Sequence, residues 1–206
     1  MKNKVSALFI GSCLLVSSMS AMGADMMVRM RAISVMPVET GTVAGGDVTI
    51  SNAAVPEIDF SYFFNESFAA ELILATATHG VGAYNTAAGN INLGNVSLLP
   101  PTLLAQYHKQ FGKFKPYAGA GLNYTVFYGA DSGSDEVKSL NYTNSLGYAF
   151  QVGADYQIGD NLYLNFDVKK LYLSTDVEAK LYDNSVVKTQ VNINPLIVGL
   201  GLGYKF

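Results

Sequence analysis

The last stretch of the chain, LIVGLGLGYKF (residues 196–206), decides the fold. Large apolar side chains from Leu196 to Phe206 stand at every second position, and glycines occupy most of the positions between them. Because successive side chains of a strand point to opposite faces, this pattern predicts a strand with an apolar outer face and a small inner face.

The same period of two recurs along the chain, in segments 28–32, 58–62, 118–128, 146–156 and 162–169. The chain is 50% hydrophobic and 14% charged, with 20 Gly, 13 Tyr and 11 Phe. A membrane-spanning helix needs about 20 predominantly apolar residues. The longest stretch without charge, 72–108, is broken by glycines, asparagines and a proline pair. Only helices and closed barrels satisfy their backbone groups in lipid, which leaves a barrel.

The spacing of the segments predicts strands at 26–37, 49–64, 67–77, 96–109, 114–128, 145–158, 161–174 and 187–206. Short turns at 65–66, 110–113 and 159–160 alternate with long polar loops at 38–48, 78–95, 129–144 and 175–186. Short periplasmic turns, longer extracellular loops and an even strand number are typical of outer-membrane barrels. A soluble sandwich has no reason to keep its long loops at one end. We therefore expect an all-β, eight-stranded antiparallel transmembrane barrel with both termini in the periplasm.

The first residues predict export. Lys2 and Lys4 precede an apolar run from Val5 to Val16, and small residues near Gly23 fit a cleavage site. We expect residues 1–23 to be a cleaved signal peptide and residues 24–206 to form one barrel domain. Cleavage removes Cys13, the single cysteine. The mature chain then has no disulfide or thiolate metal site, and we expect no metal and no cofactor. A net charge of −3 with no basic run argues against nucleic-acid partners.

The closing strand also carries a pattern that resembles the outer-membrane assembly signal. Gly201, Tyr204 and Phe206 form Gly-x-x-aromatic-x-aromatic at the C-terminus. The resemblance implies that the barrel assembly machinery is a partner.

Three segments resemble the outer-membrane protein W (OmpW) family. They are LPPTLLAQY (residues 99–107), KPYAGAGLNYT (residues 115–125) and the closing GLGYKF (residues 201–206), and the similarity covers essentially the whole mature chain. The resemblance implies an eight-stranded barrel with a narrow hydrophobic interior, proposed to pass small hydrophobic molecules. The chain departs from the family in the predicted seventh strand. Lys169-Lys170 stands where tryptophan is frequent, and the chain has no Trp.

The inward positions of the predicted strands form two groups. Charged residues cluster near the periplasmic turns: Arg29, Arg31, Glu57, Asp59, Glu71, Asp155 and Asp167. Apolar residues stand above them: Ile33, Val35, Val55, Ile73, Leu104, Leu171, Leu173, Ile193 and Ile197. Side chains fill an eight-stranded barrel, and buried charges need partners. We therefore predict a polar plug beneath an apolar ligand pocket; the alternative is a wet lumen lined by the same charges.

Pro100 and Pro101 stand in the upper part of the predicted fourth strand, where each removes a backbone donor. One hypothesis is a lateral opening into the bilayer at this point. The alternative is that the prolines only end regular pairing near the rim.

Catalysis is not expected. The two histidines, His79 and His108, fall near opposite ends of the predicted barrel and cannot share a metal or a triad. We interpret each histidine as a solvated polar residue.

Taken with the resemblance, these patterns favour a monomeric barrel in the bacterial outer membrane, in contact with lipid and lipopolysaccharide. It would capture small hydrophobic solutes from outside and pass them on, with release sideways into the bilayer as one hypothesis. Two alternatives remain open: a small ion-conducting pore, and a structural barrel that contacts other surfaces through loops 78–95 and 129–144.

Overall fold

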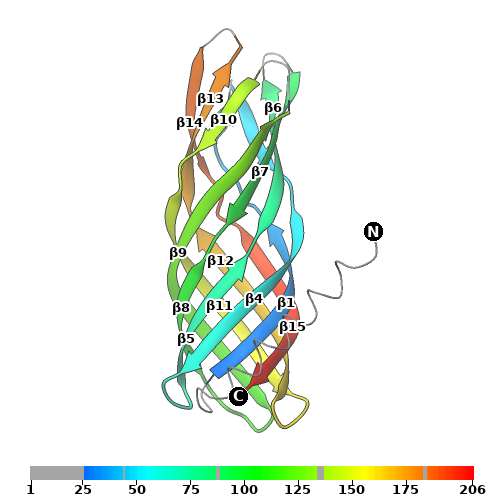
Figure 1. Cartoon of the computed structure of the whole chain (residues 1–206), viewed down its shortest axis with the longest axis vertical. Coiled ribbons are helices and arrows are strands. Elements are labelled where there is room, and N and C mark those ends of the chain that lie inside the picture. The colour runs from blue at the N-terminus through cyan, green and yellow to red at the C-terminus, as the bar shows by residue number, and fades with distance from the viewer. Residues whose placement is uncertain (1–25, 44, 87–88, 134–136, 183–184) are drawn as a thin grey trace, which may run out of the picture.

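A computed structural model describes residues 26–43, 45–86, 89–133, 137–182 and 185–206 (Figure 1). The predicted signal peptide, residues 1–23, lies outside the described residues. No helix in these ranges is long and apolar enough to cross a membrane.

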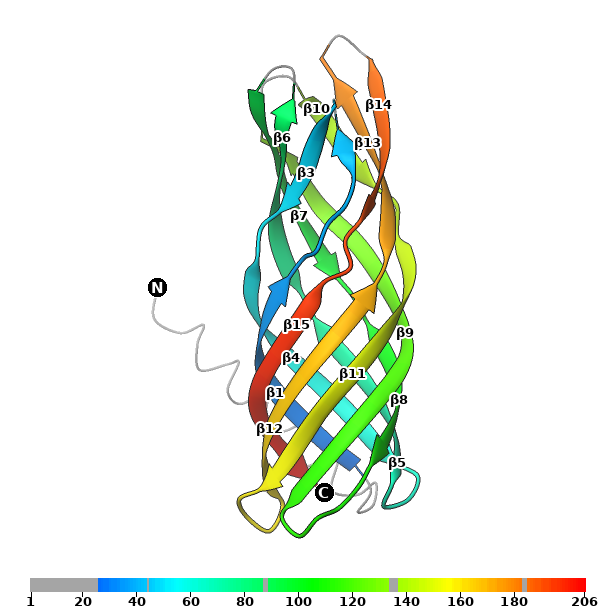
Figure 2. The ribbon, with the colours of Figure 1, turned by 180° about the vertical axis from the view of Figure 1, so that it is seen from behind.

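A closed barrel of antiparallel strands forms the lower part of the molecule (Figures 1 and 2). Its strands, in order around the wall, are β1 (Met26–Met36), β4 (Ala53–Phe63), β5 (Phe68–Ala75), β8 (Thr102–His108), β9 (Phe114–Ser132), β11 (Ser145–Gln157), β12 (Leu162–Tyr172) and β15 (Leu196–Lys205). The first strand pairs with the last, and β11 pairs with β9, so the wall has no edge. The predicted eight-stranded antiparallel barrel is confirmed.

The barrel is inside out relative to a soluble protein. Leu122, Leu146 and Leu200 on its outer surface are 61%, 71% and 56% exposed, whereas Arg29 inside is fully buried. The alternation read from the sequence produces this arrangement, because Arg29 and Arg31 point inward while Met30 between them points outward. Such a surface suits lipid as its solvent.

Three short connections lie at one end of the barrel, between β4 and β5, β8 and β9, and β11 and β12. The two described chain ends meet there as well, because the Phe206 amide donates to the Met26 carbonyl at 2.9 Å. We call this the turn end and the opposite one the loop end.

At the loop end, the segments predicted as polar loops are mostly strands, and this part of the prediction was wrong. These strands are β2 (Thr42–Val43), β3 (Gly46–Ile50), β6 (Ala77–Thr86), β7 (Gly89–Leu99), β10 (Val137–Tyr142) and β13 (Ser174–Leu181). The single strand predicted at 187–206 divides into β14 (Val186–Asn192) and β15. Glycine and asparagine in 78–95 suggested turns, but β6 and β7 pair through irregular registers that use these residues. Gly94, for example, has a φ of +113°, and a Cβ added there would lie only 1.8 Å from the Asp131 carbonyl oxygen. The position requires glycine because β7 and β9 approach closely, and not because the chain turns.

The extensions form two groups above the barrel (Figures 1 and 2). One group, β7-β6-β3-β2, continues the main sheet from β9, and the other is a separate three-stranded sheet, β10-β13-β14. The interior between the groups is apolar, and it continues the core of the upper barrel. The segments predicted as polar loops therefore enclose an apolar interior.

Candidate functional site

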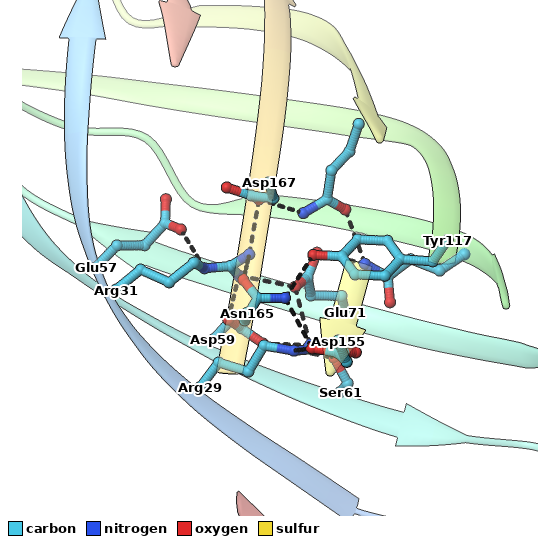
Figure 3. Close-up of polar contacts among 12 residues, drawn as sticks. Arg29, Arg31, Glu57, Asp59, Ser61, Glu71, Tyr117, Asp155, Asn165 and Asp167 are labelled. Carbon is cyan, nitrogen blue, oxygen red and sulfur yellow. Dashed lines mark hydrogen bonds and ion pairs between the residues drawn. The ribbon is translucent and has the colours of Figure 1, made fainter. Parts of the chain in front are cut away.

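Arg29 of β1 anchors a buried charge network near the turn end (Figure 3). Its Nε and Nη2 donate to the two carboxylate oxygens of Asp155, at 3.0 and 2.8 Å. Its Nη1 donates to Asp59 at 2.9 Å and to Ser61 at 2.8 Å. The planar guanidinium matches a carboxylate in two parallel bonds, so its orientation is fixed.

Arg31, two residues further along β1, holds the next level of the network (Figure 3). It donates to Glu71 at 2.9 Å and to Asp167 at 2.7 Å, and it also binds Asp59. Its Nε lies 2.9 Å from Glu57 as an ion pair, although the bond is not aligned as a hydrogen bond. The structure thus brings together all seven residues that the sequence placed in the plug.

Lys169 of β12 belongs to the same network and is 1% exposed. Its ammonium group lies 2.7 Å from Glu57 and 2.9 Å from Asp167. The lysine that departs from the family pattern therefore forms the upper boundary of the network. We call Arg29, Arg31, Glu57, Asp59, Glu71, Asp155, Asp167 and Lys169 the charge network.

Neutral polar residues, none of which was predicted as part of the plug, complete the network. Gln106 donates to Glu71 at 2.7 Å and to Gln151 at 2.8 Å, and Gln151 donates to Asp167 at 2.7 Å. Asn165 donates to Asp155 at 2.8 Å and to Tyr117 at 3.0 Å. All of them occupy inward positions of their strands, so the alternation contained the signal. The predicted plug included charged residues alone and therefore left these neutral side chains out.

Above the charge network lies an apolar cavity in the upper barrel and the extensions. Eight of the predicted pocket residues line it: Ile33, Val35, Val55, Ile73, Leu171, Leu173, Ile193 and Ile197. Further lining residues from the extension strands, missed because they were assigned to loops, include Val48, Val81, Leu93 and Val177. Val96 and Val191, which fall in predicted strands, also line the cavity and were not predicted to do so. The free volume is about 80 Å³, whereas one water occupies about 10–15 Å³ on the same scale.

Leu104 was placed in this pocket and does not line it. The side chain is buried, but in the β5–β8 register Leu104 stands opposite Glu71, at the level of the charge network. Thr102, two residues nearer the loop end, lines the cavity instead.

Pro100 and Pro101 separate β7 from β8, and their effects on the wall differ. The pairing with β5 and β6 stops at Ile73↔Thr102 and resumes at Ala77↔Leu98. The Pro101 carbonyl accepts from the Tyr124 amide of β9 at 3.0 Å, so Pro101 faces β9. The Pro100 carbonyl accepts from the side chains of Asn123 and Thr102, at 3.2 and 3.0 Å, and not from the interrupted side. Of the two prolines, Pro100 lines the cavity.

The two histidines are buried, so their interpretation as solvated residues was wrong. His79 is 2% exposed and lines the cavity, and its Nδ1 donates to the Ser51 carbonyl at 2.7 Å. His108 packs between the rings of Phe63 and Tyr117, with both centroid distances 4.9 Å. Each follows the inward alternation of its strand. In the described ranges no group of three His, Cys, Asp or Glu side chains is arranged to hold a metal.

The residues of the C-terminal assembly pattern lie on β15 and just after it. Tyr204 is exposed on the outer surface and its ring lies 5.0 Å from that of Phe206. Gly201 faces Arg31 in the β1–β15 register. Their recognition by the barrel assembly machinery stays a prediction.

A family model described as the OmpW family matches residues 22–206. The chain belongs to the OmpW family. A relative named uncharacterized outer-membrane protein y4mB, from Sinorhizobium fredii, is 39% identical over 87% of this chain and 79% of its own length. Outer membrane protein W of Escherichia coli is 30% identical over 100% of this chain and 99% of its own.

Solved structures agree with the family assignment. The crystal structure of OprG from Pseudomonas aeruginosa superposes with a TM-score of 0.80 at 27% identity, over 89% of this chain and 96% of OprG. This OmpW-family chain is therefore an outer-membrane β-barrel protein.

Proposed function

We propose that this OmpW-family barrel binds small hydrophobic molecules in its apolar cavity and passes them across the outer leaflet into the membrane. The observation that carries the proposal is the apolar cavity directly above a buried charge network. An apolar cavity with few polar groups is the kind of site that takes a small hydrophobic ligand.

The charge network supports entry from the loop end, because it would act as a plug. Every charged member of it is at most 4% exposed, and its groups are bonded to one another across the barrel. A solute moving straight through would have to separate buried ion pairs, at a cost of several kcal/mol for each charge left unpaired. We propose that the loop end faces outward and that the turn end, with both termini, faces the periplasm.

A blocked floor requires a sideways exit, and the gap in pairing beside Pro100 is our candidate. On one side of this gap are β5 and β6, and on the other side are β8 and β7. The gap adjoins the cavity. A relative named dibenzothiophene metabolism operon protein PahQ, from Pseudomonas aeruginosa, is 30% identical over 80% of this chain. That name is consistent with an apolar aromatic solute. Outer-membrane lipid, lipopolysaccharide and the barrel assembly machinery are the partners we propose for a monomeric barrel.

The cavity can be tested by filling it. Ile73→Trp places a large ring in the cavity, whereas the neighbouring Leu72 points outward and is 39% exposed. In cells that depend on the protein for uptake of a hydrophobic solute such as naphthalene, we expect Ile73→Trp to reduce uptake strongly. Leu72→Trp is the matched control and should not. Equal uptake by both folded variants would contradict transport through this cavity.

The ion-pore alternative makes the opposite prediction in planar bilayers. We expect the wild-type barrel to conduct ions poorly, because the plug excludes a continuous water column. Large and steady currents would favour the pore.

A further inference from the structure

Two charged side chains are among the described residues that line the cavity, and both lie at its floor. These are Lys169 of β12 and Glu57 of β4, which are 1% and 4% exposed. The remainder of the lining is mainly aliphatic, so a ligand that reaches the floor meets one ammonium group and one carboxylate.

Lys169 has a donor left for a ligand. An ammonium group has three protons. One is directed to Glu57 Oε1 at 2.7 Å and one to Asp167 Oδ2 at 2.9 Å. The third has no acceptor among the described residues, and the side chain borders the cavity.

Glu57 supplies the complementary acceptor. Its Oε1 is shared by Lys169 and the Arg31 Nε. In the described ranges no protein group is bonded to Oε2. The floor therefore presents one donor and one acceptor on two neighbouring residues whose charges cancel.

We propose that the cavity selects apolar molecules that carry one terminal hydroxyl group, namely aliphatic or aromatic alcohols. The hydroxyl oxygen accepts from Lys169 and its proton is donated to Glu57, while the hydrocarbon part fills the apolar space above. A carboxylate ligand is disfavoured because it would lie beside the negative charges of Glu57 and Asp167. An alkane is disfavoured because it forms no hydrogen bond with the Lys169 ammonium group or the Glu57 carboxylate. This inference rests on the proposed function and adds the ligand class.

The variant that tests the floor is Lys169→Met combined with Glu57→Gln. It removes one positive and one negative charge, so the net charge of the charge network is unchanged. The matched control is Lys170→Met. Lys170 is the next residue on β12, it lies outside the cavity lining, and its ammonium group donates to the Asn194 carbonyl.

Binding is measured in nanodiscs with 1-octanol, n-nonane and octanoate, by NMR of the isoleucine methyl groups of the cavity and of the Lys169 ammonium nitrogen. A hydrogen bond to a charged group is worth about 1.5 kcal/mol or more, so 1-octanol should bind about tenfold more tightly than n-nonane. Only 1-octanol should shift the Lys169 signal. In the double variant the preference should disappear, and in Lys170→Met it should persist.

The outcomes separate the two proposals. Isoleucine methyl signals that respond to neither 1-octanol nor n-nonane would overturn the cavity function itself. Equal affinities for these two probes in the wild type, or a preference for octanoate, would overturn the alcohol specificity while leaving the cavity function intact. A preference for 1-octanol that survives in the folded double variant would also overturn the role of Lys169 and Glu57.

Discussion

Arg29 has no exposed surface, and its guanidinium donates to Asp59, Ser61 and Asp155. Removing one partner from a buried ion pair leaves an uncompensated charge and costs about 3–5 kcal/mol. We therefore expect Arg29→Met to lower the free energy of unfolding by about that amount. Urea unfolding of the barrel in lipid vesicles measures the change.

The control for Arg29 is a lysine in an exposed pair. Lys188 of β14 lies 2.7 Å from Glu178, but the side chains are 73% and 42% exposed. Water screens such a pair, so Lys188→Met should leave the unfolding transition where it is. Two variants with equal stability would contradict the importance of the buried network.

At the scale of single residues, the sequence predicted which charges point inward but not what completes them. Arg29, Arg31 and their carboxylates were found because alternation assigns them to the inner face. His108 was misjudged because a histidine near a predicted turn suggests solvent. Burial of that ring depends on Phe63 and Tyr117 from two other strands, and such contacts across the barrel leave no local pattern.

At the scale of the strand, the two adjacent prolines should have different effects. Pro100→Val adds an N–H beside the gap in pairing with β5 and β6, and one hydrogen bond is worth about 1 kcal/mol net. If the strands part here during solute release, we expect uptake to slow about fivefold. Initial uptake rates of a hydrophobic solute measure this.

Two other prolines are the controls for that prediction. Pro101→Val adds an N–H toward β9 and should have a smaller effect, because the Tyr124 amide already bonds to Pro101 on that side. Pro116 lies in β9 near the turn end, far along the strand from the cavity, and Pro116→Val should leave uptake as it is. An unchanged rate in Pro100→Val would count against a lateral exit at this gap.

Strands with strict alternation, such as β1 and β11, were predicted within about a residue or two, as expected for boundaries. The β6–β7 hairpin was not. Its pairing shifts register between Val81 and Gly82 and again between Ala83 and Thr86, so the period of two is interrupted. A bulge changes which residues face inward, and a sequence pattern cannot locate it without the partner strand.

At the scale of the molecule, the barrel and the extensions should differ in stability. The strands β11, β12 and β15 belong to the closed wall, whereas β10, β13 and β14 form a sheet of their own. A small sheet outside the closed wall opens more easily than the wall itself. We expect the amides of β10, β13 and β14 to exchange faster with deuterium, and together, in a lipid bilayer. Uniform protection along the whole chain would contradict this division.

A cavity with a closed floor also determines how uptake depends on concentration. Under the proposed function, molecules would not follow one another in single file through the barrel, because each would have to leave the cavity before the next could enter. Uptake should therefore saturate as the outside concentration rises, and two different solutes should compete for the same place. The barrel would behave as a carrier with a single binding site, and its maximal uptake rate would be set by the residence time of each bound molecule.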